Sequence, residues 1–135
     1  MDEYLDLVNP RDEIIGKKLR SEMYSEGLSN FRVVNAFLVN PKGQIWIPRR
    51  SPNKRLFPLG FDMSMGGHVE SGEQYEQAFK RELAEELNID VDEVSWRLLG
   101  YLTPQVDYVS AFMKVYEISA DVTPQLNKYE FIESF

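Results

Sequence analysis

The chain has 135 residues, the length of one ordinary domain, and it contains no cysteine. The absence of thiols excludes a disulfide framework, a thiolate nucleophile and a cysteine-based zinc site. Its 22 acidic and 15 basic residues give a net charge of −7, which disfavours binding to a nucleic-acid backbone as the main activity.

The hydropathy of the chain and its N-terminal residues indicate where in the cell the protein is expected. No apolar run approaches the roughly 18 residues of a membrane helix. The N-terminal sequence MDEYLDLVNPRDE lacks the basic start and the apolar segment of a secretory signal. We therefore expect a cytoplasmic protein without a membrane partner. Because the sequence shows no internal repeat and no Pro/Gly/Ser-rich linker, residues 1–135 are predicted to form a single domain.

The first half of the chain alternates β-rich runs with turn residues. Strands are predicted for five segments: Tyr4–Val8, Glu13–Ile15, Phe31–Val39, Gln44–Pro48 and Phe61–Met65. A short helix over Lys17–Glu26 is expected to end at Gly27. Residues 49–60, with two prolines and four basic residues, predict a loop, and Gly66 and Gly67 are expected to interrupt the last strand.

The second half contains the clearest helix, over Gln74–Leu87. Strands are predicted over Trp96–Leu102 and Tyr108–Ile118, with a turn at Pro104 between them, and the tail from Asp121 is expected to be irregular. Interspersed helices and hairpins predict a mixed sheet rather than a parallel one. This order of elements fits an α/β sandwich with helices on both faces.

One face of the Gln74–Leu87 helix is apolar, with residues that recur every four positions: Tyr75, Phe79, Leu83 and Leu87. Glu82, Glu85 and Glu86 fall on one shoulder of this stripe, within about one turn of each other. Half-buried carboxylates repel each other, so a hard divalent cation such as Mg²⁺ or Mn²⁺ suits the cluster. The alternative is an ordinary solvated helix in which Lys80 and Arg81 neutralise the glutamates.

A glycine-rich turn with the sequence GGHVESGE, residues 66–73, leads directly into this helix. Glycine lets the backbone approach an anion or a metal closely, and a helix start adds free N–H donors. The fixed residues are spaced as Gly67-x5-Glu73-x7-Arg81-Glu82-Leu83-x-Glu85-Glu86-x-Asn88-Ile89. This pattern resembles the Nudix box, G-x5-E-x7-R-E-U-x-E-E-x-G-U, where U is a bulky aliphatic residue. One fixed position differs: Asn88 replaces the glycine that ends the helix, and asparagine is the next best residue there.

The resemblance implies a Nudix α/β/α sandwich with a mixed β-sheet. It also implies a Mg²⁺-dependent hydrolase, with Mn²⁺ as the other candidate ion, in which water attacks phosphorus and cuts a diphosphate bond. The substrate would be a small molecule, a nucleoside diphosphate linked to another group or a related diphosphate.

Carried over to this chain, the family's metal ligands are Glu82, Glu85, Glu86 and the carbonyl of Gly66. Glu82 is alternatively the base that takes the water proton, and Glu82, Glu86 and Arg81 form the expected catalytic set. Gly67 and Glu73, together with Arg81, are expected to organise the loop and the helix.

A wider resemblance covers roughly residues 7–89. The stretches NPRDEIIG, RRSPNK, FPLGFD and GGH look like the Nudix subfamily related to type I isopentenyl-diphosphate isomerase. That isomerase needs a cysteine and several metal-binding histidines, whereas this chain has Gly66 at the cysteine position and His68 as its only histidine. Isomerase chemistry is therefore the less favoured alternative to hydrolysis, and His68 is interpreted as a hydrogen-bonded structural residue.

The densest basic cluster lies in residues 49–55. Arg50 and Lys54 match the positions with which the related isomerase holds its diphosphate, so we interpret them as substrate-binding phosphate clamps. The alternative is a solvated surface loop.

Many Nudix chains carry a further acid downstream of the box, and Glu130 is a better candidate here than Glu133. Such chains usually continue with another strand and a closing helix. We therefore expect either a short member of the family or a domain that lacks a C-terminal helix. A homodimer is expected by family analogy. The main alternative function is a non-catalytic nucleotide-binding module, but such modules usually lose box glutamates and none is lost here.

Overall fold

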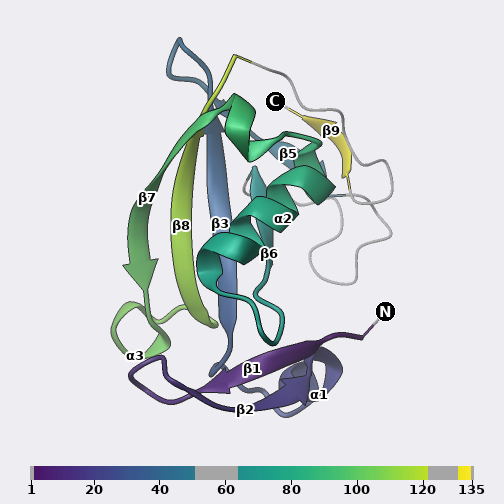
Figure 1. Ribbon diagram of the computed structural model, residues 1–135, viewed down its shortest axis with the longest axis vertical. Coiled ribbons are helices and arrows are strands. Elements are labelled where there is room, and N and C mark those ends of the chain that lie inside the picture. The colour runs from purple at the N-terminus through teal and green to yellow at the C-terminus, as the bar shows by residue number, and fades with distance from the viewer. Residues whose placement is uncertain (1, 51–63, 122–130, 135) are drawn as a thin grey trace.

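A mixed five-stranded sheet forms the centre of the molecule (Figure 1). The computed structural model describes residues 2–50, 64–121 and 131–134. The strands of this sheet are β3 (Arg32–Val39), β4 (Ile45–Trp46), β6 (Met65–His68), β7 (Ser95–Leu102) and β8 (Phe112–Ser119). Their order is β4-β3-β8-β7, with β6 paired to β3 on the edge that β8 leaves open. Because β3 and β8 run parallel and the other pairs are antiparallel, the predicted mixed sheet is confirmed.

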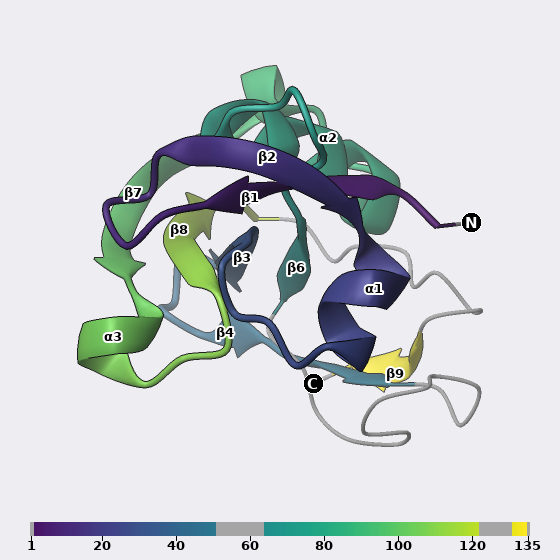
Figure 2. The same cartoon turned by 90° about the horizontal axis from the view of Figure 1, so that it is seen from below.

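Two small antiparallel pairs lie beside this sheet (Figure 2). The hairpin of β1 (Tyr4–Val8) and β2 (Ile14–Leu19) crosses the end of the central sheet, next to the short helix α1 (Arg20–Ser25). The second pair joins β5 (Pro48–Arg50) to β9 (Phe131–Ser134). The remaining elements are the 3₁₀ turn η1 (Val91–Glu93) and the one-turn helix α3 (Pro104–Asp107).

Helix α2 (Tyr75–Leu87) packs over β3 and β6 and builds the main core. Its apolar stripe is buried as predicted, and Phe79 and Leu83 are fully inside. From the sheet, the stripe meets the side chains of Val34, Ala36, Leu38, Tyr116 and Ile118. The helix ends at Asn88, whose φ of 54° is the left-handed conformation that asparagine tolerates better than most residues.

A smaller apolar cluster joins the hairpin to the central sheet. Leu5 of β1 and Met23 of α1 pack there against Phe31 and Ala111, all of them buried. Backbone hydrogen bonds from Val69 to Arg32 and from Ser71 to Tyr4 continue this connection toward the segment before α2. The hairpin therefore supports the start of the helix that carries the acidic residues.

The first helix is shorter than the sequence predicts. Residues 17–19 continue β2 and pair with β1, so α1 begins at Arg20 rather than at Lys17. The pairing places Lys17 opposite Asp6, and the Nζ atom of Lys17 lies 4.8 Å from the ring centroid of Tyr4 on the partner strand. Pairing with β1 therefore outweighs the helical propensity of residues 17–19.

Two glycines behave differently from the prediction. Gly66 and Gly67 do not interrupt a strand but lie within β6, where they pair with Asn35 and Val34 of β3. Neither has a positive φ, so neither is needed for a turn. The reason for glycine at these positions lies in the side chains packed above them.

The last strands also differ in their limits. The turn at Pro104 is the one-turn helix α3, and Tyr108 after it is left-handed with φ of 57°, so β8 begins at Phe112 rather than at Tyr108. The tail is not wholly irregular, because residues 131–134 form β9. No helix in the described ranges is long and apolar enough to cross a membrane.

Replacing Leu83 by alanine is expected to lower the free energy of unfolding by about 2–5 kcal/mol, because the fully buried side chain leaves a cavity between α2 and the sheet. Urea unfolding followed by circular dichroism measures the change. The same substitution at Leu98, which is 48% exposed on β7, is the matched control and should cost about 1 kcal/mol or less. Equal losses at the two positions would show that α2 does not build the main core.

Candidate active site

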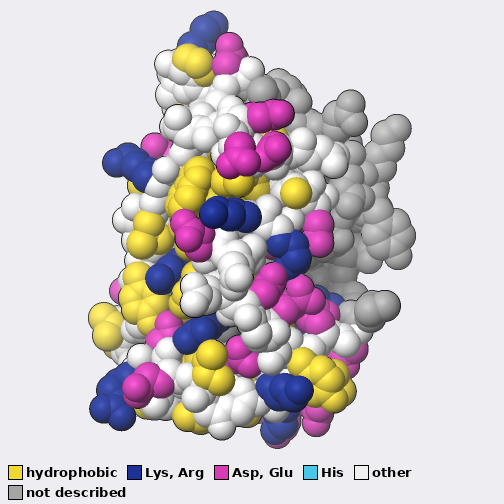
Figure 3. All heavy atoms as spheres, in the orientation of Figure 1, with side chains coloured by type: hydrophobic (Ala, Val, Ile, Leu, Met, Phe, Trp, Pro, Cys, Tyr) yellow, Lys and Arg dark blue, Asp and Glu magenta, His cyan; other side chains and the backbone are white. Residues whose placement is uncertain are grey.

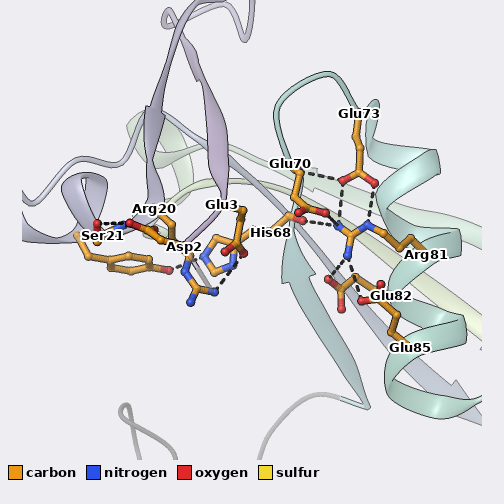
Figure 4. Close-up of polar contacts among 11 residues, drawn as sticks. Asp2, Glu3, Arg20, Ser21, His68, Glu70, Glu73, Arg81, Glu82 and Glu85 are labelled. Atoms are coloured by element: carbon orange, nitrogen blue, oxygen red, sulfur yellow. Dashed lines mark hydrogen bonds and ion pairs between the residues drawn. The ribbon is translucent and has the colours of Figure 1, made fainter.

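The residues of the glycine-rich turn and the acidic helix meet along one side of α2. Gly66 and Gly67 come from β6, Glu73 from the turn before the helix, and the remaining charged residues from α2 itself. Figure 4 shows the side chains of the turn and of the helix pointing toward one another. Residues that are spread over the glycine-rich turn and the acidic helix in the sequence therefore lie in one cluster in the structure.

Four carboxylates surround the guanidinium of Arg81 (Figure 4). Its Nε and Nη2 atoms donate to the two oxygens of Glu73 at 2.7 and 2.9 Å. Its Nη1 atom donates to Glu82 at 2.8 Å and to Glu85 at 3.2 Å. A carboxylate oxygen of Glu70 lies 3.1 Å from Nη2. A planar, five-donor group can satisfy so many acceptors at once, which a lysine cannot do.

The Arg81–Glu73 pair joins the helix to the turn. Glu73 also accepts the backbone N–H of Glu70 at 2.9 Å, and Arg81 donates to the carbonyl of His68 at 3.1 Å. Burial opposes ionisation of Glu73, but its hydrogen bonds with Arg81 and Glu70 outweigh burial and hold its pKa below the usual value. The same bond to Glu73 raises the pKa of Arg81, which stays charged.

Glu82 lies directly over the backbone of Gly67. A Cβ atom at Gly67 would overlap the carboxyl group of Glu82, with Oε1 only 2.5 Å away. Glycine is therefore required here for space. The Glu82 side chain is 14% exposed, and burial raises its pKa; the charge of Glu85 raises it further, while Arg81 opposes both.

Glu86 reaches the same strand one turn further along the helix. Its Oε2 atom accepts the backbone N–H of Gly66 at 3.1 Å. On its other side, Gly66 leaves room for Asn35, whose Oδ1 lies 2.5 Å from the place of a Cβ atom. Sequence reasoning did not single out Asn35, because its position depends on the register between β3 and β6.

These carboxylates do not form a ready ligand set. Among residues 2–50, 64–121 and 131–134, no three His, Asp or Glu side chains are arranged to hold a metal ion. Glu82 and Glu85 bind Arg81 instead. The donor chemistry still fits a hard cation, because the side chains offer only carboxylate oxygens and the space over Gly67 is kept free for one of them.

His68 and Glu70 are placed by the structure. His68 lies on β6, where its Nε2 atom is 2.7 Å from the hydroxyl of Tyr24 and its ring stacks on Phe31. Burial is the main reason that the pKa of His68 falls to about 4, so the ring is neutral. This agrees with its interpretation as a hydrogen-bonded structural residue. Glu70 faces the charged cluster rather than solvent alone.

The expected substrate residues are placed only in part. The backbone of Arg50 belongs to β5 and pairs with Phe131 of β9. Its side chain, Lys54 and Glu130 lie outside the described residues, so their roles stay predictions.

The chain matches the NUDIX domain over residues 29–133. An uncharacterized Nudix hydrolase from Nostoc sp. is 63% identical over 133 residues, which cover 98% of this chain and 79% of that protein. The chain belongs to the Nudix family. A Nudix hydrolase from Deinococcus radiodurans is 54% identical over 126 residues, or 93% of this chain and 73% of that protein.

The Nudix fold is also confirmed in three dimensions. The crystal structure of DR0079 from Deinococcus radiodurans superposes with a TM-score of 0.92 and 50% identity, covering 98% of this chain and 82% of that one. The chain is accordingly an enzyme, a Nudix hydrolase, as the box predicts. The narrower resemblance to the isomerase-related subfamily stays a prediction.

Replacing Gly67 by alanine is expected to lower the free energy of unfolding by about 1–3 kcal/mol, because the new methyl group displaces the Glu82 carboxyl group. Urea unfolding at neutral pH measures the loss. Gly100→Ala is the matched control: nothing lies within 4 Å of a Cβ atom there, so its effect should stay within about 0.5 kcal/mol. A harmless Gly67→Ala would refute the close approach of Glu82.

The Glu73–Arg81 pair predicts a pH-dependent stability. Because the pKa of Glu73 is lower in the folded state, its contribution is present above its ordinary pKa of 4.5 and disappears as the pH falls below it. We expect Glu73→Gln to cost roughly 1 kcal/mol near pH 7 and progressively less in acid. Urea midpoints across this range test the expectation, with Glu93→Gln as the exposed control. A cost that does not change with pH would contradict it.

Proposed function

We propose that the chain is a Mg²⁺-dependent Nudix hydrolase that cleaves a diphosphate bond in a nucleoside diphosphate-linked or related small molecule by water attack on phosphorus. The observation that carries this proposal is the position of Glu82 and Glu86, one turn apart, against the glycine backbone of β6. Mn²⁺ is the other candidate ion, since it accepts the same oxygen ligands.

The proposed ligands are Glu82, Glu85, Glu86 and the carbonyl of Gly66. When bound, the ion would neutralise phosphate oxygens and lower the pKa of the attacking water. Arg81 competes with such an ion for Glu82 and Glu85, because it donates to both. Its two bonds to Glu73, at 2.7 and 2.9 Å, would keep the guanidinium anchored if an ion took the Glu85 carboxylate, which lies 3.2 Å from Nη1.

In the alternative assignment Glu82 is the general base instead of a ligand. Its side chain is 14% exposed and lies over the backbone of Gly67. As the water oxygen bonds to phosphorus, the water proton passes to the Glu82 carboxylate. The bridging P–O bond breaks, and its electron pair leaves with the departing phosphate. Arg81 acts by holding Glu82 in position for this transfer.

The remaining assignments rest on the sequence. Arg50 and Lys54 would hold the diphosphate, and Glu130 would add a ligand or a base. The partner is a small-molecule diphosphate rather than a nucleic acid or a membrane, and a cytoplasmic homodimer is the proposed form. Hydrolysis is favoured over a binding-only module because all three box glutamates are present.

Glu86→Gln is expected to lower the rate of phosphate release with Mg²⁺ by at least about 100-fold, because it removes a ligand and keeps the shape of the side chain. A panel of nucleotide sugars, nucleoside triphosphates, dinucleotides and isoprenoid diphosphates supplies the substrates. Mg²⁺ affinity is measured alongside by calorimetry, and urea unfolding checks the fold.

Glu93→Gln, on the exposed turn η1, is the matched control and should retain the activity of the unchanged chain. A fully active Glu86→Gln protein with unchanged Mg²⁺ affinity would overturn the ligand assignment. Nucleotide binding without turnover on the whole panel would favour the binding module.

A further inference from the structure

A cleft lies beside the first turn of α2, where Tyr75 and Glu76 contribute to its lining. Residues of β7 and β8 line this cleft, whereas Glu82 and Glu86 lie against β6. Figure 1 shows β6 on one side of β3 and the strands β8 and β7 on the other. The volume of the cleft is about 820 Å³, within the range of small-molecule sites. Figure 3 draws a face of the molecule on which hydrophobic, basic and acidic side chains lie next to one another.

Aromatic and aliphatic side chains form its floor and rim. Trp96 and Tyr116 meet with ring centroids 5.8 Å apart, and both rest on Phe79 of the core. Leu98 and Ile14 stand at the rim, where they are 48% and 56% exposed. A flat apolar ligand that covers these side chains would remove their surface from water.

One end of the cleft is held rigid by the carboxylate of Asp12. It accepts hydrogen bonds from Nε of Arg32 at 2.7 Å and from the hydroxyls of Tyr75 at 2.6 Å and Tyr101 at 2.8 Å. Burial and the bond to Asp12 raise the pKa of Tyr75, and they raise that of Tyr101 to about 12, so both phenols stay donors. The two rings are therefore fixed before any ligand arrives.

Lys114 brings a positive charge to the cleft. Its Nζ atom lies 4.7 Å from the ring centroid of Tyr75 and 6.0 Å from that of Tyr101, and it forms no ion pair within the described part of the chain. The other cation of the cleft, Arg32, is already bound to Asp12. Lys114 is therefore the cation in the described lining of the cleft that can pair with a bound anion.

Three carboxylates border the cleft, and two of them are engaged. Asp12 binds Arg32, and Glu73 binds Arg81. Glu76 forms no ion pair among the residues that the structure describes. Glu76 lines the cleft together with Trp96 and Tyr116 of the aromatic floor. Glu76 can accept a hydrogen bond from a ligand donor.

We propose that this cleft is a second binding site, for a small planar aromatic anion that also carries an amino group. An amino-bearing nucleoside monophosphate has this chemistry. Its phosphate pairs with Lys114, its ring covers Trp96 and Leu98, and its amino group donates to Glu76. The proposal rests on the cleft residues alone and is independent of hydrolysis at Glu86.

Adenosine monophosphate is the probe, titrated into the full chain with EDTA so that metal-dependent binding at the acidic site is removed. We expect saturable binding by calorimetry and amide shifts in NMR spectra at Leu98, Tyr101 and Lys114. Adenosine and inorganic phosphate each lack one half of the ligand and should bind at least about 10-fold more weakly. Inosine monophosphate, which lacks the amino group, should also bind more weakly.

Two variants of one residue separate charge from packing. Lys114→Met keeps the stem and removes the charge, so affinity should fall at least about 10-fold; Lys114→Arg should stay within about threefold. Lys42→Met, in the exposed turn after β3, is the matched control without effect. Should Lys114→Met not fold, Leu98→Glu places a negative charge at the exposed rim and should abolish binding.

Three outcomes overturn the proposal. The first is an absence of binding in EDTA, and the second is a folded Lys114→Met or Leu98→Glu protein that binds like the unchanged chain. The third is a set of NMR shifts centred on Gly66 and Gly67, which would place the nucleotide in the acidic site. None of them bears on whether Glu86→Gln loses Mg²⁺-dependent turnover, so the two proposals fail separately.

Discussion

The guanidinium of Arg81 holds together three carboxylates that would otherwise repel each other. Glu73 comes from the turn, whereas Glu82 and Glu85 come from the helix, and each carboxylate accepts a hydrogen bond from the same cation. Like charges this close are stable only around a compensating charge. Arg81 is only 25% exposed, so water screens the interaction less than it would at an open surface. The hydrogen bonds that shape the acidic site are therefore also the ones that connect α2 to β6 and to the turn after it.

Helix α2 is fixed from two directions. On one side Arg81 ties it to the turn, and on the other the Asp12 carboxylate binds Tyr75 in its first turn. Asp12 has a φ of 61°, a left-handed conformation that aspartate tolerates, and this turn carries the carboxylate to the helix. The hairpin of β1 and β2, which contributes no box residue, thereby positions the helix that carries the box. The acidic site and the aromatic cleft share this helix but meet different strands, β6 for the site and β7 and β8 for the cleft.

Sequence patterns predicted the elements with strong periodicity and the site residues that share one helix. The stripe of α2 and the left-handed end at Asn88 follow from local spacing. The sequence does not predict contacts that depend on the register between two strands, such as the contact of Asn35 with Gly66. The role of Asp12 was hidden for the same reason, because its partner Tyr101 lies far along the chain. The helix predicted from Lys17 failed because strand pairing overruled propensity.

The parallel pairing of β3 with β8 has a consequence for how the chain folds. Arg32 faces Phe112, so the two central strands come from positions about 80 residues apart. Closing so long a loop costs chain entropy before the contacts between the two strands stabilise the structure. The hairpin of β1 with β2 and the adjoining pair β7–β8 are local and can form early. Until β3 meets β8, the apolar stripe of α2 lacks the part of its cover that Tyr116 and Ile118 of β8 supply.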